Sequence, residues 1–490
     1  MSTSASGTTS SVTMDESYED HFRPEFKRYK KKQPPPDMQD VLDVDNEEKF
    51  NGSLYKLNPR GDAIASSAPS ISAKLGLTSP FTWRCHAVHG YPGFQYIRNP
   101  FLPKWQRYWV KRCIADYPCK PNVTNMDAHA HESSLTNPWE ASRQKFCKGA
   151  ERGRTVIDEL RWVTLGYHYD WNDKVYHEDS HSPFPKDLSL ISSFIAGVLG
   201  YDSFQPQAAI VNFYHMDSTL GGHTDHSEFD LTAPLISYSF GQSAILLVGG
   251  QTKATKPLAL HLRSGDVVVL GGDSRLAYHA VPRIMYASED GQLPPCFSLS
   301  DRDTAETSKE EDMKASGDVE VRLNFENITG EVAVSSVDGR PSEVVMETNS
   351  PDACTPQEMS EDNGTIGNGD SVEKNSSVMT HACQIHPSSY QCQPDSEAES
   401  NSDYGVLRAN SMLHKHCPIT AAMSSEAYKL CNAEQWEPID GYLRNARINV
   451  SVRQVTGPGK GFPPRDGGIA SRDNFDSKHN KNKKMKAGDG

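Results

Sequence analysis

The chain contains four His-x-Asp pairs, each of which could offer two ligands to one metal ion: His168/Asp170, His177/Asp179, His215/Asp217 and His223/Asp225. Two residues separated by one position on a strand project to the same face. An imidazole nitrogen and a carboxylate oxygen can then occupy adjacent positions on one ion, and a distant histidine would complete a facial triad with open positions for a cosubstrate and O₂. Taken alone, each pair is more often an ordinary polar pair, so the surrounding sequence has to distinguish them.

The surroundings favour His223 and Asp225. A predicted turn at Gly221-Gly222 places this pair at the end of a series of short strands. Upstream, Asn212 and Tyr214 share one strand face and can direct polar groups at the same cavity. Downstream lies His279, a candidate third ligand that, by itself, would be interpreted as a hydrogen-bonded core histidine.

A second pattern with chemical potential lies near the C-terminus. Arg447, Asn449, Ser451 and Arg453 alternate with apolar residues and would share one face of a strand. Two inward-facing arginines are costly unless they are paired, and a dicarboxylate is a natural partner because a guanidinium binds carboxylates bidentately. An ordinary amphipathic strand with solvent-facing arginines fits the same pattern, so the sequence alone leaves both interpretations open.

The elements around these residues predict a mainly β fold with flanking helices. Glycine-punctuated strands are expected at 208–214, 235–240, 244–248, 258–262, 266–270 and 446–455. They do not alternate with long helices, which favours an antiparallel barrel or jelly roll over a parallel sheet. One helix is expected after Pro103, and Asp187 is expected to cap another. Their predicted buried faces carry Trp105, Trp109 and Cys113 in the first, and Leu190, Ile191, Phe194, Ile195 and Val198 in the second.

Charge is distributed unevenly along the 490 residues, whose net charge is −14. Residues 286–430 hold 26 acidic and 9 basic residues, whereas the remainder holds 38 acidic and 41 basic ones. The acidic segment therefore carries −17 and the remainder +3, which is compatible with a polyanionic partner. A basic stretch at residues 27–32 is expected to be a solvated patch, with nucleic-acid contact or nuclear import as the alternative.

Composition also predicts how the chain is divided. We expect residues 1–70 to be largely disordered, 71–285 to form the first part of a catalytic domain, and 286–430 to be an acidic low-complexity insertion. Residues 431–456 would then supply the closing strand, and 457–490 a disordered basic tail. The ten cysteines form no C-x-x-C pair, which argues against a zinc site or a disulfide framework.

No apolar run is long enough to span a membrane and no secretory signal is visible, so an intracellular protein without membrane association is expected. Nucleus, cytoplasm and mitochondrion are not distinguished.

The order N-x-Y, H-x-D, a distant His, and R-x-N-x-[ST]-x-R resembles the AlkB family of nucleic-acid dioxygenases. Longer stretches resemble the first group of eukaryotic AlkB homologues: residues 160–169, 217–221, 237–244, 274–276 and 279–283. The similarity covers roughly residues 85–285 and 434–456. Four spaced motifs support this resemblance. The resemblance implies a double-stranded β-helix, also called a jelly-roll barrel.

The resemblance also implies roles for individual residues. His223, Asp225 and His279 would bind Fe(II). The cosubstrate 2-oxoglutarate (2OG) would be bound by a second set, with Arg447, Asn449 and Tyr214 at its distal carboxylate, and Asn212 and Arg453 nearer its metal-chelating end. A third set would contact the flipped base: Trp162, Tyr167 and Tyr169.

The activity implied by the resemblance is oxidative demethylation. 2OG and O₂ would yield succinate and CO₂ while an N-methyl group on a base is hydroxylated and lost as formaldehyde. The base must leave its stack, which favours unpaired or looped substrates such as tRNA carrying N1-methyladenine, or methylated DNA.

Two alternatives remain open. One is the same chemistry on a protein such as a histone, with the acidic insertion as a possible surface for a protein partner. The other is a non-enzymatic nucleic-acid-binding protein. The preferred base and the oligomeric state are not predicted.

Overall fold

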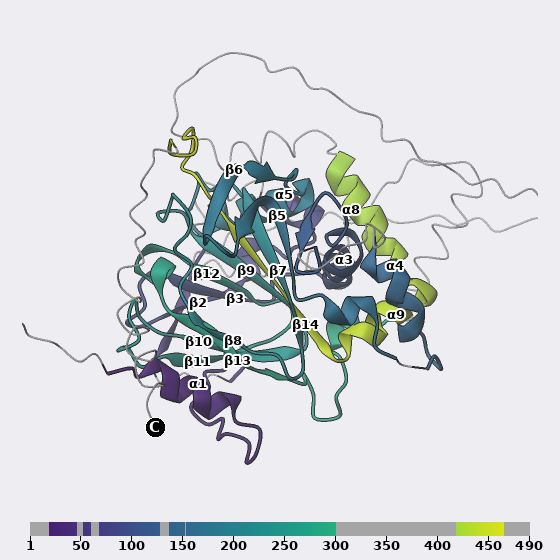
Figure 1. Ribbon diagram of the computed structural model, residues 1–490, viewed down its shortest axis with the longest axis horizontal. Coiled ribbons are helices and arrows are strands. Elements are labelled where there is room, and N and C mark those ends of the chain that lie inside the picture. Colours follow the sequence, from purple (N-terminus) through teal and green to yellow (C-terminus); the bar gives the residue numbers. More distant parts are fainter. Residues whose placement is uncertain are drawn as a thin grey trace, which may run out of the picture. The chain divides into compact units, whose positions relative to one another are not determined.

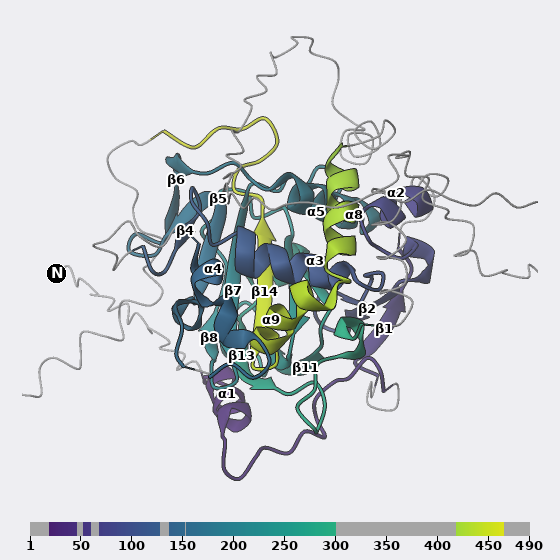
Figure 2. The same cartoon turned by 90° about the vertical axis from the view of Figure 1, so that its right-hand side faces the viewer.

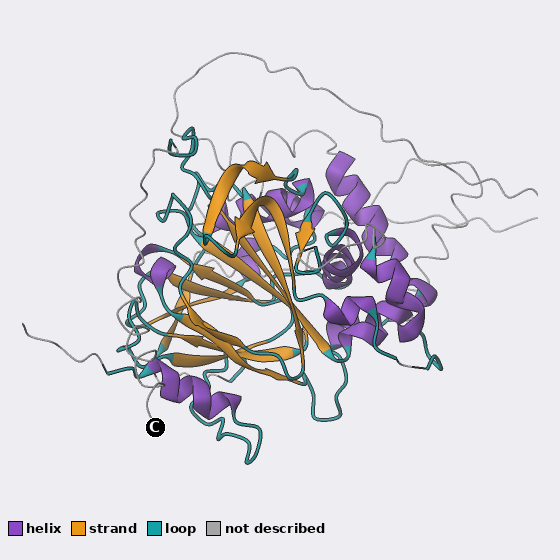
Figure 3. Ribbon diagram, in the orientation of Figure 1, coloured by secondary structure: helices purple, strands orange, loops and turns teal. Residues whose placement is uncertain are grey.

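The computed structural model of the chain describes residues 19–46, 52–59, 68–127, 137–151, 153–299 and 418–464. All of them belong to one compact unit. Antiparallel strands form two sheets, and helices lie outside them (Figures 1 and 3). The strands are β1 (Leu54–Leu57), β2 (Arg84–Val88), β3 (Phe94–Arg98), β4 (Val123–Thr124), β5 (Trp162–Asp170), β6 (Val175–His181), β7 (Ala208–His215), β8 (Leu220–His223), β9 (Leu235–Gly241), β10 (Ser243–Val248), β11 (Leu258–Leu262), β12 (Val267–Leu270), β13 (His279–Met285) and β14 (Ala446–Arg453).

The helices are α1 (Phe22–Lys30), α2 (Ala68–Lys74), α3 (Trp105–Lys111), α4 (Pro138–Ser142), α5 (Lys186–Val198), α8 (Pro418–Lys429) and α9 (Ala433–Leu443). A π-helical turn, η3 (Arg112–Asp116), extends α3. Short 3₁₀ segments are η2 (Pro80–Thr82), η4 (Arg143–Phe146), η5 (Val156–Glu159), η6 (Gly272–Leu276) and η7 (Pro295–Phe297). No helix in the described ranges is long and apolar enough to cross a membrane.

The larger sheet has ten strands in the order β1-β2-β3-β12-β9-β14-β7-β5-β4, with β6 paired to β5. The smaller sheet has the order β11-β10-β13-β8. Strand β14 lies between β7 and β9, so a strand from the C-terminal part of the chain occupies the middle of a sheet built from residues before 286. The predicted mainly β fold with flanking helices is confirmed, and the two antiparallel layers agree with the predicted jelly roll.

Each face of the larger sheet has its own core. The face toward the smaller sheet buries Leu235 and Val268 against Leu246 and Leu260. The opposite face is covered by helices, among them α3 and α9 (Figure 2). Trp105, Trp109 and Cys113 are all buried on the predicted helical face, as are the five apolar side chains predicted for the second helix.

The predicted capping role of Asp187 is wrong. Helix α5 has Pro185 at its N-cap, and Asp187 lies in the first turn. Its buried carboxylate instead accepts hydrogen bonds from Tyr108 (2.7 Å) and Arg112 (2.8 Å). Asp187 therefore pairs with a partly exposed cation from another helix, and its other oxygen accepts the neighbouring amide of Leu188 (2.9 Å).

The N-terminal part of the chain corrects another prediction, because residues within 1–70 form α1 and β1. The ring of Phe22 on α1 is 2% exposed and packs on the outer face of the smaller sheet. A Cβ atom added to Gly222 or Gly249 would lie 2.7 Å or 2.9 Å from that ring, so glycine permits this close approach. Gly221 and Gly222 lie within strand β8 and not in the predicted turn.

The basic stretch at 27–32 lies on and just after α1. Its lysines are exposed, as predicted, but Tyr29 is buried and Arg28 pairs with Asp40 (2.8 Å). The guanidinium of Arg283 donates to the backbone carbonyls of Tyr29 and Lys31. The end of α1 within this stretch therefore packs against β13, and its lysines face solvent.

The boundaries predicted for the acidic segment are also wrong at both ends. Residues 286–299 include η7, and α8 packs against α3 through Lys111 and Glu426 (3.0 Å). The acidic composition of 286–430 as a whole obscured this helix, which buries Met423 and Ala427. Residues 300–417 lie outside the described residues. The predicted disordered tail is wrong for residues 457–464, which the structure describes next to β14.

Asp43 anchors the N-terminal segment, and its replacement by asparagine should lower stability in a pH-dependent way. Burial alone would raise the pKa of this carboxyl, but His261 and a bidentate pair with Arg263 (both 2.7 Å) hold it well below its usual range. Because the folded-state pKa is depressed, the stabilisation is present above the unfolded-state pKa of about 3.9 and is lost as pH falls below it.

We expect Asp43→Asn to cost about 1–2 kcal/mol at pH 7, with the difference from wild type shrinking below about pH 4. Urea unfolding between pH 7 and pH 3 measures it, with the exposed Asp202→Asn as control. A difference that stays constant over this range would contradict the assigned pairing.

Candidate metal and cosubstrate site

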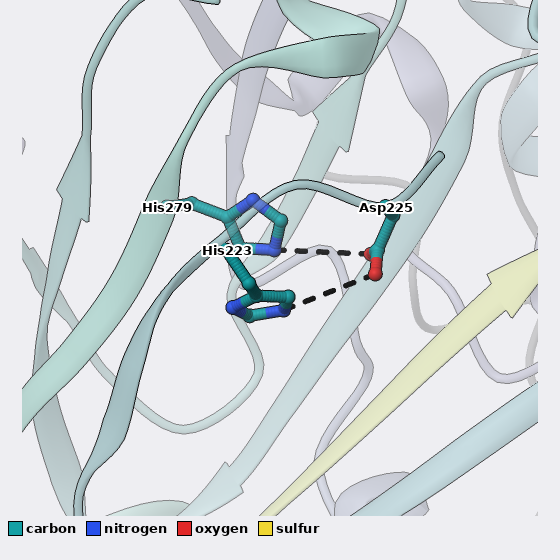
Figure 4. Close-up of side chains that lie close together, drawn as sticks. All are labelled: His223, Asp225 and His279. Atoms are coloured by element: carbon teal, nitrogen blue, oxygen red, sulfur yellow. Dashed lines mark ion pairs between the residues drawn. The ribbon is translucent and has the colours of Figure 1, made fainter. Parts of the chain in front are cut away.

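Three side chains predicted as metal ligands converge in the structure (Figure 4). His223 ends β8 and His279 begins β13, and the two residues are direct partners in the sheet. Asp225 lies two residues beyond the end of β8. The prediction that His223 and Asp225 lie on one strand is therefore wrong. The Nε2 atoms of His223 and His279 are each 3.8 Å from an Asp225 oxygen, and the three ligand atoms all lie within 4.8 Å of one another.

Hydrogen bonds orient both imidazoles for metal binding. The Nδ1 atom of His223 donates to the carbonyl of Gly221, and that of His279 donates to the carbonyl of Ala277, each over 3.0 Å. A carbonyl only accepts, so the proton is on Nδ1 and the Nε2 lone pair faces Asp225. Burial, together with His223, lowers the pKa of His279 to about 4. A neutral imidazole at neutral pH is the form that binds a metal ion.

A buried ionic network holds Asp225 in its charged form. Its carboxylate pairs with Arg453 (3.0 Å), and its backbone carbonyl accepts from Arg275 (2.6 Å). Both arginines also pair with the buried Glu228, at 3.2 Å and 2.8 Å. Burial would raise the pKa of Asp225, but Arg453 and the two histidines outweigh this effect and hold it well below its usual range. Two imidazoles and one carboxylate fit a divalent metal ion.

Sequence reasoning did not find Glu228 or Arg275. Both are buried charged residues whose partners lie on other elements, so the spacing of residues in the sequence does not predict them. Arg453 was predicted to lie near the chelating end of 2OG, and the structure places its guanidinium against Asp225 and Glu228.

Arg447 lies in the interior between the sheets with an incomplete set of partners. Its side chain is 1% exposed, and its register partner Tyr214 belongs to the core between the two sheets. Its terminal nitrogens donate to the Gln242 carbonyl (3.2 Å) and the Ser239 hydroxyl (2.7 Å).

Within the described ranges, the Nε atom of Arg447 has no hydrogen-bond partner and no carboxylate forms an ion pair with this residue. Burial lowers the pKa of Arg447 to about 10. A buried cation with an unused donor fits the carboxylate of a bound dicarboxylate such as 2OG.

Asn449 lies on the same strand face as Arg447, and Asn212 lies next to Asn449 on the neighbouring strand. Strand register makes them direct neighbours across β14 and β7. The Asn449 amide already donates to Ser237 (2.7 Å) and to the Tyr238 carbonyl (2.9 Å), so its two donors are in use. The predicted contact of Asn449 with 2OG therefore stays a prediction. The predicted contacts of Asn212 and Tyr214 with 2OG also stay predictions. Burial raises the pKa of the Tyr214 hydroxyl to about 12.

The sequence of this chain is similar to a family of oxygenases that use Fe(II) and 2OG. Residues 93–318 match the 2OG-Fe(II) oxygenase superfamily. Human "nucleic acid dioxygenase ALKBH1" is 40% identical over 291 residues, which cover 57% of this chain and 74% of the human protein. This chain is an AlkB-family 2OG-Fe(II) oxygenase.

Two further relatives lie in other kingdoms. The "tRNA demethylase abh1" of Schizosaccharomyces pombe is 34% identical over 288 residues, covering 56% of this chain and 87% of the yeast protein. The "DNA N(6)-methyladenine demethylase ALKBH1A" of Arabidopsis thaliana is 31% identical over 296 residues, covering 55% and 81%. The superfamily match ends at residue 318, whereas the structure adds β14 and Arg447 to the same oxygenase core.

The residues predicted to contact a base lie on the β5–β6 hairpin of this AlkB-family core. Trp162 and Tyr169 both contact Trp171, with ring centroids 5.2 Å and 4.8 Å apart. Trp162 is also the register partner of Asn212 on the face that carries Arg447. Trp171 is 47% exposed and was not predicted, because it lies in the turn between two strands that the sequence did not reveal.

The other His-x-Asp pairs have different roles. His168 bonds to Thr164 (2.8 Å), and His215 bonds to the carbonyl of Asp158 (3.0 Å). On the hairpin, Asp170, Asp173 and His177 also lie within 4.8 Å of one another. The Asp170 carboxylate there accepts backbone amides of its own turn (2.7 and 3.2 Å), which accounts for its position.

Proposed function

We propose that this protein is an Fe(II)- and 2OG-dependent dioxygenase that oxidatively demethylates methylated bases in nucleic acid. The observation that carries the proposal is the combination of a His-Asp-His triad with the unpaired Nε of Arg447 in one core. The names of the human, fission-yeast and Arabidopsis relatives, which refer to nucleic acid, tRNA and DNA, support the substrate class.

Each part of the site has a physical task in this proposal. Fe(II), when bound, supplies the activation of O₂ that couples oxidation of the substrate to decarboxylation of 2OG. His223, His279 and Asp225 would hold the ion, a set of three ligands that is typical of sites where cosubstrates bind beside the protein ligands. Arg447 anchors the far carboxylate of 2OG, and Arg453 keeps Asp225 deprotonated.

The hairpin supplies the surface for the base. A base can reach the site only after leaving its helical stack, and aromatic rings compensate the stacking that it loses. Trp171 offers an exposed ring beside Trp162 and Tyr169. We therefore propose unpaired or looped methylated RNA, such as tRNA, or unpaired methylated DNA as substrate.

A methylated protein such as a histone is the second candidate substrate. The observation that favours it is the excess of acidic residues in 286–430, which would attract a basic peptide. A non-enzymatic role fits less well, because all three ligands converge and their orienting hydrogen bonds are present.

The test compares wild type with His223→Ala and Arg447→Ala. Succinate and formaldehyde are quantified with added Fe(II) and 2OG on three substrates: tRNA carrying N1-methyladenine, a methylated DNA oligonucleotide and a methylated histone peptide. We expect equimolar products from nucleic acid in the wild type and their loss in both variants. The exposed His89→Ala is the control and should match wild type.

Full activity of His223→Ala and Arg447→Ala would refute the site. Turnover of the peptide alone would replace the nucleic-acid proposal with the protein-substrate one.

A further inference from the structure

The chain continues past β14 onto the loop that follows Asp225. The backbone carbonyl of Val455 accepts hydrogen bonds from the amides of Phe229 (2.8 Å) and Asp230 (3.1 Å). The Gln454 side chain donates to the Asp230 carboxylate (2.7 Å). Phe229 and Asp230 are therefore held by the segment that follows β14.

This segment is fixed at its root and then turns back. The Gln207 side-chain oxygen accepts from the amides of Val455 (2.7 Å) and Thr456 (2.8 Å). Gly459 has a φ of +70°, and the Lys460 amide donates to the carbonyl of Gly457 (2.9 Å). Figures 1 and 2 show the yellow segment after β14 at the same end of the molecule as β6.

The turn places Phe462 between the β5–β6 hairpin and the loop that follows Asp225. Its ring centroid lies 4.8 Å from that of Tyr167 on β5 and 5.3 Å from that of Phe229. Both ring pairs are edge-on, an attractive geometry for aromatic groups. Phe462 is half-buried, whereas Phe229 is 44% exposed.

The hairpin and the loop also meet through two polar contacts. Tyr169 and Ser227 hydroxyls lie 3.3 Å apart, and the Tyr176 hydroxyl donates to Glu228 (3.2 Å). Among the described residues, the aromatic contacts between these two elements all go through Phe462. Phe462 thus joins the hairpin and the loop that begins at Asp225 through aromatic contacts, beside Val455, which packs with Tyr176.

We infer that Phe462 is a positioning residue that holds the β5–β6 hairpin at a fixed distance from the metal ligands. The inference rests on the proposed function only in assigning the hairpin to substrate. Phe462 makes none of the ring, ion-pair or hydrogen-bond contacts of His223, Asp225, His279 or Arg447 given above. Its loss should therefore loosen the binding of the base and leave binding of metal and 2OG intact.

Two readouts on Phe462→Ala test this inference in the full-length protein. Amide hydrogen exchange should become about fivefold faster or more in β5–β6 and residues 226–230, because two ring contacts that resist local opening are lost. Strands β10 and β11 should exchange as in wild type. With a methylated oligonucleotide, KM should rise about tenfold, while kcat and the KM for 2OG stay within about twofold.

Two matched variants complete the design. Phe462→Tyr keeps the aromatic ring, so it should restore wild-type exchange and KM. Phe81→Ala removes an exposed phenylalanine on η2 and should change neither readout.

Unchanged exchange in the hairpin of Phe462→Ala would overturn the inference. So would faster exchange spread evenly over both sheets, or a parallel rise in the KM for 2OG, because either would mark a merely structural residue. If wild type turns over no nucleic acid, the proposed function fails, and the exchange measurement still decides whether Phe462 holds the hairpin.

Discussion

Replacing Asp225 with asparagine should lower Fe(II) affinity and turnover by more than about a hundredfold while the protein stays folded. Loss of a residue that merely supports a metal ligand typically costs about 10–100-fold in metal affinity or activity, and Asp225 is itself the proposed ligand. Asparagine keeps the shape of the side chain but removes the charge that two neutral imidazoles cannot supply. Metal binding is measured by titration under anaerobic conditions, and turnover by succinate release.

The fold should survive this substitution because the network around Asp225 contains a second anion. Arg453 would keep its pairing with Glu228 (3.2 Å), so no buried cation would be left alone. The exposed Asp217→Asn, from another His-x-Asp pair, is the control and should behave as wild type. Near-wild-type metal affinity in Asp225→Asn would remove this residue from the metal site.

Replacing Arg447 with methionine should raise the KM for 2OG roughly a hundredfold or more. Truncating one partner of a buried charge pair costs about 2–5 kcal/mol, and every 1.4 kcal/mol is about tenfold in affinity. Steady-state kinetics with varied 2OG measures the effect. The exposed Arg444→Met, three positions earlier, is the control.

The same substitution should not destabilise the protein without 2OG. Arg447 is buried with an unused donor, and burial lowers its pKa to about 10, so its charge carries an uncompensated desolvation cost. We expect Arg447→Met to unfold at the same denaturant concentration as wild type or a higher one. Addition of 2OG should stabilise wild type and not the variant. Strong destabilisation of the unliganded variant would mark Arg447 as a structural residue.

Local patterns predicted the parts of the site that depend on strand periodicity. Arg447, Asn449 and Arg453 alternate with apolar residues, and the period of two alone indicates that they share a face. Choosing His223 and Asp225 from four similar pairs needed context, namely the flanking strand residues and His279. In the structure, these residues converge because β8 pairs with β13, and β14 with β7.

Other parts of the site depend on contacts between distant segments, which periodicity does not record. Phe22 covers Gly222 next to a metal ligand, although its surroundings in the sequence resemble a polar tail. Phe462 follows a run of glycine, proline and lysine yet lies between Tyr167 and Phe229. Glu228 and Arg275 are charged residues whose burial is explained only by each other and by Arg453.

We propose that the triad and Arg447 bind Fe(II) and 2OG together in one core completed by β14. Visible absorption under anaerobic conditions tests it most directly, because chelation of Fe(II) by 2OG produces a charge-transfer band. We expect a band in wild type that requires both additions. It should be lost in Asp225→Asn and should appear in Arg447→Met only at much higher 2OG concentration. A wild type without the band, or an Asp225→Asn variant that retains it at full intensity, would show that Fe(II) and 2OG do not bind together at this site.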